Sequence, residues 1–436
     1  MESPARMNPR HHGDPDPSRS RAAIAVGLFG LALALLLLAW HWPSLAELWV
    51  ALDPVSAAGR CVDDEARTVL FCDFFQHYYP EGKAVFALAK PIPGFFYPAP
   101  FAIAMGGLAL LPYPVALAAW VGLLVAATAG LYLLPQLDLF ARSKSASLLY
   151  GLLFATSLAV LHNFVWGQVS ALTSLLVLGA LVLHARGHRS GAAVALAIAT
   201  SIKFYPAFFA LYFVLRRDTG AVVVFGVSCA LLLFALPTAV LGMDGTLGFY
   251  QTLASSLDEL SRLVESSRYS NYIANAVSLL LAGSIEPDSA LVLGLKVVGY
   301  ALATLNAVLL YRLIAGRVEH EAYWAAALGM SAIPLVVGSS WIHYFIALPF
   351  LQAFLFFTLL RSSLAPWSRF GLCAVFLLPS ILFSNVFFFD RFAVPDTYYG
   401  GGFQFWSNAL LLPVLYLQAL RCLRGAPKAE TSGSSL

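Results

Sequence analysis

Long apolar runs recur along this 436-residue chain, and the charged residues gather between them. Hydrophobic residues make up 60% of the sequence and charged residues only 11%, whereas soluble domains carry about 25% charged residues. A water-soluble fold of this size has no way to bury so much apolar surface, but a bilayer accepts it. The sequence therefore predicts an all-α polytopic membrane protein.

Twelve apolar segments are candidates for transmembrane helices, each of which typically needs about 20 residues. They lie at 22–42, 113–135, 147–162, 168–184, 192–202, 204–215, 220–241, 289–313, 322–338, 345–360, 370–388 and 404–420. The first segment is too long for the core of a signal peptide and lacks a clear cleavage site, so we expect it to be retained. The pair 192–202 and 204–215 is short, because about 11 residues rise only ~16 Å. We expect two short crossing helices that meet at Lys203.

The positive charges predict the orientation of the chain, because cytoplasmic loops carry an excess of lysine and arginine. With the N-terminus inside, seventeen of the 26 lysines and arginines fall on the cytoplasmic side and seven on the other side. We therefore expect residues 1–21 to form a disordered cytoplasmic tail, 22–420 a single transmembrane domain and 421–436 a second cytoplasmic tail. The expected location is a bacterial inner membrane, with the active side facing the periplasm or exterior.

Two predicted outer loops are long, at residues 43–112 and 242–288. The first contains an apolar stretch at 98–111, which is too short to span easily and is expected to form a helix at the membrane interface. The second contains an amphipathic stretch at 246–264 and a short apolar stretch at 273–281. Short interfacial helices are thus expected on the outer side.

Several classes of site find no support in the sequence. The net charge is only +3, and no basic run is interleaved with aromatic residues, so a nucleic-acid partner is not expected. The five cysteines have no metal-ligand spacing, and we predict no cofactor, with assistance by a divalent metal ion left open. Cys61 and Cys72 share the first outer loop, where a disulfide would persist. Whether they pair is left open.

Polar residues gather in six clusters, and the predicted topology puts all six on the outer side. The clusters are residues 72–83, 94–100, 162–170, 201–206, 266–272 and 339–345. A chain that avoids charge this strongly keeps polar groups where they are hydrated or functional. The pattern predicts one outward-facing cavity, typical of an enzyme that works at the outer membrane interface.

Three residues are candidates for chemistry. Asp73 is flanked by phenylalanines, a setting that raises a carboxylate pKa and suits a general base, although a helix N-cap is the alternative. Lys203 lies in an apolar stretch and is suited to a phosphate, unless it snorkels to the interface or pairs with a carboxylate. His343 could act as an acid, donate to a phosphate, or be an ordinary interfacial histidine.

Other polar and aromatic residues are candidates for binding. Tyr78, Tyr79 and Tyr97 could stack on a sugar ring, although an interfacial aromatic belt is the commoner role. Gln168 and Asn271 could bind hydroxyl groups or cap helices.

The order of these clusters resembles glycosyltransferase family 87, membrane enzymes of the GT-C superfamily. The resemblance covers about residues 20–420 and depends on the joint order of short motifs. These are Asp73 with Tyr78 and Tyr79, Tyr97-Pro98-Ala99-Pro100, Gly167-Gln168, Lys203-Phe204-Tyr205-Pro206 and Trp341-Ile342-His343. The alanine between the two prolines, Ser170, and the residues after Asn271 depart from the family pattern.

The resemblance implies a GT-C-like bundle of about 12 transmembrane helices, with a large first outer loop that carries short interfacial helices. It implies inverting transfer of a hexose, commonly mannose, from a polyprenyl-phosphate donor to a lipid or glycan acceptor, among membrane lipids. Asp73 would be the catalytic base, and Lys203 and His343 would bind the donor phosphate. Sugar or acceptor would be bound by Tyr78, Tyr79, Tyr97, Gln168, Asn271 and Trp341. The alternative is a secondary transporter or channel for a polar solute, although no inverted repeat is evident.

Overall fold

The computed structural model describes residues 71–265, 267, 269–383 and 402–425. The predicted tail at 1–21, the first predicted span at 22–42 and Cys61 lie outside the described residues. So do the last residues of the segment 370–388 and most of the tail at 421–436. Cys72 is disulfide-bonded, and the other three cysteines of the described part are free.

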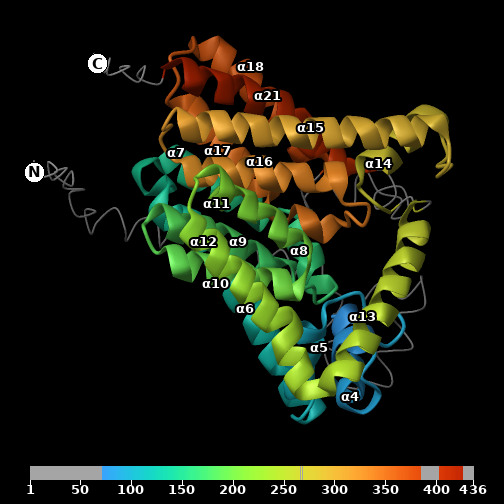
Figure 1. The fold of residues 1–436 in the computed structure, drawn as a ribbon. Coiled ribbons are helices and arrows are strands. Elements are labelled where there is room, and N and C mark those ends of the chain that lie inside the picture. The colour runs from blue at the N-terminus through green and yellow to red at the C-terminus, as the bar shows by residue number, and fades with distance from the viewer. Residues whose placement is uncertain (1–70, 266, 268, 384–401, 426–436) are drawn as a thin grey trace, which may run out of the picture.

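The described residues form helices joined by short turns and contain no β-strand (Figure 1), so the all-α prediction is confirmed for this part of the chain. The α-helices are α4 (Tyr79–Leu88), α5 (Ala99–Leu108), α6 (Tyr113–Asp138), α7 (Lys144–Ala155), α8 (Leu158–Val165), α9 (Ser170–Ala185), α10 (Arg189–Ile202), α11 (Leu211–Leu215), α12 (Thr219–Ala230), α13 (Leu236–Glu265), α14 (Ile273–Ala282), α15 (Ala290–Ala315), α16 (Glu321–Val336), α17 (Leu348–Leu360), α18 (Pro366–Phe383) and α21 (Phe403–Gly425). Five short 3-10 or π-helical segments accompany them: η1 (Phe74–Tyr78), η2 (Phe140–Arg142), η3 (Tyr205–Ala210), η4 (Leu231–Ala235) and η5 (Ile342–Ala347).

Four helical segments are long and apolar enough to cross a membrane. They are Tyr113–Asp138, Thr219–Arg262, Ala290–Ala315 and Ile342–Leu360. Seven further apolar helices of the described part are shorter than a typical span. These segments support the membrane-protein class, while the count of twelve spans stays a prediction.

Polar side chains determine where several helices begin. Ser143, Ser157, Asp218 and Ser289 each accept a hydrogen bond from a backbone N–H three residues later, at the starts of α7, α8, α12 and α15. Such a cap satisfies one of the backbone N–H groups that have no partner inside the helix. The cap at Ser157 divides the predicted span 147–162 into α7 and α8.

The predicted break at Lys203 is present in the structure. Helix α10 ends at Ile202, and Lys203 has an extended backbone, with φ −139° and ψ 143°. The chain then continues as η3, with Pro206 near its start. Because the backbone of Lys203 is extended, its side chain does not continue a face of α10 or of η3. The side chain is buried between helices.

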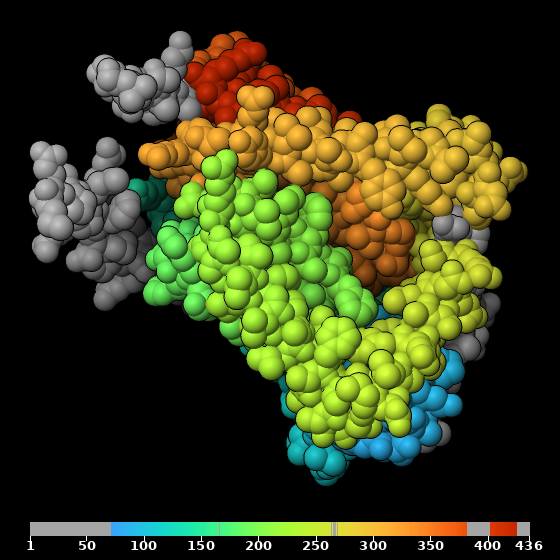
Figure 2. All heavy atoms as spheres, in the orientation of Figure 1, coloured from blue at the N-terminus to red at the C-terminus, as the bar shows by residue number. Residues whose placement is uncertain are grey.

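The predicted span 220–241 and the amphipathic stretch 246–264 form one kinked rod. The rod comprises α12, η4 and α13, and it bends at Gly242, where φ is 76°. In Figure 1 the yellow-green α13 and the gold α15 reach away from the main bundle, with α14 near the far end of α15. Figure 2 shows orange atoms set back between these two arms, so this face of the molecule is hollowed.

The helices enclose two main hydrophobic clusters. The larger joins α6–α11 to α15–α17 and α21. The second joins η1, α4, α5 and the first half of α6, and it includes Phe249 and Leu253 of α13. The stretch 98–111, predicted as an interfacial helix, therefore forms a helix, α5, that packs closely on α4. A Cβ at Gly82 of α4 would lie only 2.3 Å from the backbone oxygen of Met105.

Candidate active site

A turn after α8 holds the start of η1 in place. Gly167 has φ +64°, and a Cβ there would lie 3.0 Å from Cα of Phe71. Phe71 also has a positive φ, 62°. The backbone N–H of Asp73 donates to the oxygen of Trp166 at 3.0 Å. Glycine is suited to this turn because it has no Cβ to block the left-handed conformation or the approach of the neighbouring chain.

Asp73 begins η1, but its side chain does not cap that helix. Instead, its carboxylate accepts a hydrogen bond from the side-chain amide of Gln168. Burial raises the pKa of Asp73 to about 7, against the opposing effects of the Lys203 charge and the Gln168 hydrogen bond. The geometry therefore does not support the N-cap alternative, and the carboxyl group titrates near neutral pH, where a general base is most effective.

Gln168 connects Asp73 to three other polar groups. Its amide oxygen accepts hydrogen bonds from the hydroxyl groups of Tyr78 and Tyr97, both at 3.3 Å. The same oxygen accepts from Nζ of Lys203 at 3.4 Å. The two tyrosine hydroxyls are 2.6 Å apart. Gln168 is only 5% exposed, so one buried amide bridges a carboxylate and an ammonium group.

Lys203 is buried among polar and aromatic groups, with only 7% of its surface exposed. Its Nζ donates to Oγ of Ser170 at 3.1 Å. It also lies 4.6 Å from the ring centre of Tyr344 and 5.6 Å from that of Tyr97. Cation–π contacts of this kind stabilise a desolvated ammonium group. The buried position does not support the snorkelling alternative.

His343 lies within a stack of rings at the start of η5. Its ring is 5.6 Å from that of His162 and 5.1 Å from that of Tyr344, with interplanar angles of 28° and 30°. His343 is 4% exposed, and its Nδ1 has no hydrogen-bond partner among the described residues. Since Nζ of Lys203 also lies 4.6 Å from the Tyr344 ring centre, the histidine and the lysine both contact this aromatic ring.

Three predicted binding residues lie outside this network. The hydroxyl group of Tyr79 donates to the oxygen of Leu111 at 3.4 Å, away from Asp73. Oδ1 of Asn271 accepts from the N–H of Phe405 at 3.3 Å. Trp341 precedes η5 and is partly exposed. Their roles in binding stay predictions, and the contacts of Tyr79 and Asn271 connect segments of the fold.

The structure brings the six polar clusters together. Four of them meet directly in the network around Gln168, and the cluster 339–345 joins through His343 and Tyr344. The cluster 266–272 is attached to the cluster 339–345, because the backbone N–H of Asn271 donates to the oxygen of Ser340 at 2.8 Å. The described residues hold no group of three or more His, Cys, Asp or Glu side chains arranged to bind a metal ion.

Sequence reasoning did not assign roles to Ser170 or Tyr344, and it treated His162 only as a weaker candidate than His343. Ser170 follows the Gly-Gln pair by two residues, so it lies on the first turn of α9, beside Gln168. The position of Ser170, two residues after Gln168, was the signal that the sequence offered. Side chains two residues apart at a helix start can lie on the same side of the turn. The ring stack of His162 with His343 had no local signal, since the two are far apart in the chain.

A comparison with protein families bears on this site. The family model of glycosyltransferase family 87 matches residues 95–340, more than half of the chain. The chain belongs to glycosyltransferase family 87. The predicted resemblance is confirmed, and the protein is a membrane glycosyltransferase, in contrast to the alternative of a transporter or channel. A comparison with curated proteins found no match.

The matched region and the site overlap only in part. Tyr97, Gln168 and Lys203 lie inside residues 95–340, whereas Asp73, Tyr78 and His343 lie outside. The position of Asp73 beside Gln168 therefore comes from the tertiary contacts rather than from the family match. A family 87 glycosyltransferase needs a donor and an acceptor for its sugar, and the network around Gln168 is the candidate place where they meet.

Proposed function

We propose that the protein is an inverting glycosyltransferase. It transfers the hexose mannose from a polyprenyl-phosphate donor to a lipid or glycan acceptor. One observation carries the proposal: a single buried amide, Gln168, contacts both the carboxylate of Asp73 and the ammonium group of Lys203. A base and a cation at one place are what direct displacement of a phosphate from a sugar requires.

Asp73 is the proposed base. The acceptor hydroxyl is a weak nucleophile, and its proton passes to the Asp73 carboxylate as its oxygen bonds to the anomeric carbon. In the same step the bond between the anomeric carbon and the phosphate oxygen breaks, and its electron pair leaves with the polyprenyl phosphate. A single displacement of this kind inverts the anomeric configuration. The near-neutral pKa of Asp73 suits this role, because the carboxylate is available at neutral pH and still accepts a proton.

Lys203 and His343 are the proposed phosphate ligands. The leaving phosphate gains one negative charge in the reaction, and a buried cation stabilises that charge more strongly than water does. Lys203 is held by Gln168 and Ser170, so its ammonium group is positioned before the donor binds. Nδ1 of His343 has no hydrogen-bond partner in the described part of the chain, and the ring lies beside the Tyr344 ring that Lys203 contacts. In this proposal Lys203 supplies the compensating positive charge and His343 donates a hydrogen bond to the phosphate.

Tyr78, Tyr97 and Gln168 are proposed to position the sugar or the acceptor beside Asp73. Their hydroxyl and amide groups are already linked, so a sugar hydroxyl that exchanges for one of these bonds is held in a defined orientation. Trp341, Tyr79 and Asn271 are also proposed to bind the sugar or the acceptor, although they lie outside the network around Gln168. Membrane lipids surround the helices, and no nucleic acid takes part.

Transfer by the purified protein in nanodiscs tests this function. The donor is polyprenyl-phospho-mannose with a radiolabelled sugar, and the acceptor is a bacterial membrane lipid extract. We expect the label to move from the donor to a component of the extract when EDTA is present. NMR of the product should show the inverted anomer. Lys203→Met and His343→Ala should raise the donor concentration required for half-maximal rate. Transfer from GDP-mannose but not from the lipid donor would overturn the proposal.

We also propose that the site faces the outside of a bacterial inner membrane and that both termini are cytoplasmic. Single cysteines in a background without the three free cysteines test this orientation. The exposed positions Lys83 and Ser255 should react with a membrane-impermeant maleimide in intact cells. The exposed positions Gly187 and Arg317 should react only after permeabilisation. Labelling at Gly187 in intact cells would reverse the proposed topology.

A further inference from the structure

The segment that joins α4 to α5, residues 89–98, carries Tyr97 to the candidate active site. The hydroxyl group of Tyr97 lies 2.6 Å from that of Tyr78 and donates to Oε1 of Gln168 at 3.3 Å. Its ring centre lies 5.6 Å from Nζ of Lys203. The position of this segment therefore decides whether Tyr97 meets the groups that contact the proposed base and the proposed phosphate ligand.

The segment contains a tight turn at residues 92–95. The backbone N–H of Phe95 donates to the oxygen of Ile92 at 3.1 Å, and Gly94 has φ +82°. Pro93 at the second position and a glycine with positive φ at the third are typical of a type II turn. Pro91 and Pro93 have no N–H, so Ile92 is the one residue of 91–93 whose backbone can donate a hydrogen bond.

Glu81 of α4 accepts that hydrogen bond. Its Oε2 lies 2.8 Å from the backbone nitrogen of Ile92, and the residue is fully buried. Its other oxygen, Oε1, has no hydrogen-bond partner in the part of the chain that the structure describes. Burial raises the pKa of Glu81 to about 7, against the opposing effect of the Ile92 hydrogen bond. Burial of a carboxyl group is costly, and the bond to Ile92 is what this position provides in return.

His77 holds the same turn at a second point. A Cβ at Gly94 would lie 2.5 Å from Cε1 of His77 and 2.9 Å from its Nδ1, so the imidazole ring lies directly against the backbone of the turn. His77 belongs to η1 and Glu81 to the first turn of α4. The turn is thus held at its start by a hydrogen bond and at its centre by a ring contact.

Phe95 connects the turn to Tyr97. The Phe95 side chain is fully buried, and its ring centre lies 5.2 Å from that of Tyr97 and 6.1 Å from that of Phe101. Only Phe96 separates Phe95 from Tyr97 in the chain. A shift of the turn would therefore move Phe95 and, with it, the hydroxyl group of Tyr97.

We propose that Glu81 is a positioning residue: its bond to Ile92 holds the turn in the place where the Tyr97 hydroxyl meets Tyr78 and Gln168. The proposal rests on the proposed function and adds a residue that acts through Tyr97 rather than on the substrate. In this role Glu81 needs an oxygen that accepts from Ile92 and does not need a negative charge. A general base, in contrast, needs the charge.

A double-mutant cycle of Glu81→Leu and Tyr97→Phe tests the proposal, with transfer from polyprenyl-phospho-mannose as the measurement. Tyr97→Phe should lower turnover about tenfold, the effect of roughly one hydrogen bond. Glu81→Leu should lower it about tenfold or more, because the turn is released. The double variant should be about as active as Glu81→Leu alone, since the hydroxyl group is already displaced. Losses that multiply would overturn the proposal.

Glu81→Gln separates positioning from proton transfer. The amide oxygen of glutamine can still accept from the N–H of Ile92, so turnover should stay within a few-fold of wild type. A folded Glu81→Gln protein with turnover as low as that of Glu81→Leu would show that the carboxylate itself is needed, and it would overturn the positioning role.

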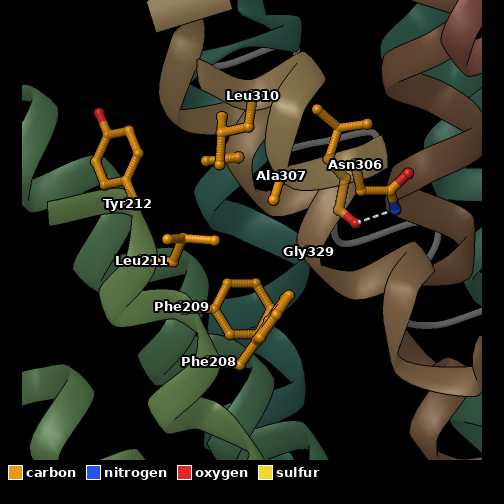
Figure 3. Close-up of a pocket in the computed structure, with 10 residues that line it drawn as sticks. Phe208, Phe209, Leu211, Tyr212, Asn306, Ala307, Leu310 and Gly329 are labelled. Carbon is orange, nitrogen blue, oxygen red and sulfur yellow. Dashed lines mark hydrogen bonds between the residues drawn. The ribbon is translucent and has the colours of Figure 1, made fainter. Parts of the chain in front are cut away.

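Asn306→Leu is the matched control, and Asn306 lines a pocket between α11, α15 and α16 (Figure 3). Like Glu81, Asn306 is buried and joins two segments, because its Nδ2 donates to the oxygen of Leu328 at 2.8 Å. Its Oδ1 also has no partner among the described residues. Asn306→Leu should lower the free energy of unfolding and keep the turnover of the folded protein within a few-fold. An equal loss of turnover in Asn306→Leu and Glu81→Leu would overturn the proposal.

Gly94→Ala keeps the proposal testable if Glu81→Leu does not fold. Its new Cβ presses on His77 and moves the same turn, so its effect should also fail to multiply with that of Tyr97→Phe. Multiplying losses in this second cycle would overturn the proposal. If wild type transferred no sugar from the lipid donor, the proposed function itself would fail, whereas transfer with multiplying losses would overturn only the role of Glu81.

Discussion

The amide nitrogen of Gln168 donates a hydrogen bond to the carboxylate of Asp73, although 95 residues separate the two in the chain. The oxygen of the same amide accepts from Lys203. A neutral amide can satisfy a carboxylate on one side and an ammonium on the other, because it has both donor and acceptor groups. This arrangement keeps the two charged groups in one site and leaves each with capacity to bind a substrate.

Asp73→Asn should reduce turnover about 10²–10⁴-fold, the usual contribution of a general base. Asparagine has nearly the same shape, so the protein should fold and still bind undecaprenyl phosphate. Asp258→Asn is the matched control, because this carboxylate is exposed on α13 and pairs with Arg262 four residues later on the same helix. Turnover of Asp73→Asn within a few-fold of wild type would remove Asp73 as the base and turn attention to two other carboxylates of the sequence, Glu81 in the cluster 72–83 and Asp396.

The rate of transfer should rise with pH and level off above about 7. Burial raises the pKa of Asp73 to about 7, and only the ionised carboxylate accepts the proton. The charge of Lys203 opposes this rise, so Lys203→Met should move the midpoint of the profile to higher pH. Rates at saturating donor between pH 5.5 and 9 measure the shift. A midpoint that moves to lower pH in Lys203→Met would contradict the assignment.

Gln168→Leu should lower both the free energy of unfolding and the turnover. The loss of the amide removes one hydrogen-bond donor to Asp73 and one acceptor from Lys203, and each buried group left unsatisfied costs about 1–3 kcal/mol. Displacement of Asp73 by about 1 Å would lower turnover by about 10²-fold. Gln418→Leu is the control, since Gln418 is also buried and donates to the oxygen of Thr358 at 3.0 Å. It should lower stability while the activity of the folded fraction is retained.

Gly167→Ala should impair transfer more than a strained backbone alone would. Both Gly167 and Gly187 have a positive φ, so alanine at either position costs about 1–2 kcal/mol. At Gly167 the new Cβ also presses on Phe71 and displaces Asp73, whereas at Gly187 it meets nothing within 4 Å. Thermal unfolding and transfer assays of both variants separate the two effects. Equal activity of the two variants would show that the contact with Phe71 is unimportant.

The helical class and the break at Lys203 were predictable, because both depend on local patterns. Apolar length predicts a membrane helix, and a lysine followed by Tyr205-Pro206 within an apolar stretch predicts an interruption. The spans themselves were less predictable. Ser157 caps α8 inside a continuous apolar run, and a hydropathy pattern does not register one hydrogen bond of this kind.

The candidate site was predictable as a set of residues but not as a geometry. Asp73, Gln168, Lys203 and His343 all stood out as polar groups in an apolar chain, and they do lie together. Their partners did not stand out. The local sequence was as compatible with Asp73 as a helix N-cap as with Asp73 as a base, and it was compatible with a binding role for Tyr79. The contact of Tyr79 with Leu111, which lies just after α5, depends on how α4 packs on α5.

The sequence alone was enough to establish an all-helical membrane protein with a set of polar residues concentrated on a few short segments. Hydrophobicity and charge are properties of each residue, so they can be read without knowing the neighbours in space. The role of Gln168 required the folded structure. The amide meets Asp73 and Lys203 only because the Gly167 turn holds η1 against the start of α9 and α10 ends in an extended residue, and contacts between distant segments are properties of packing.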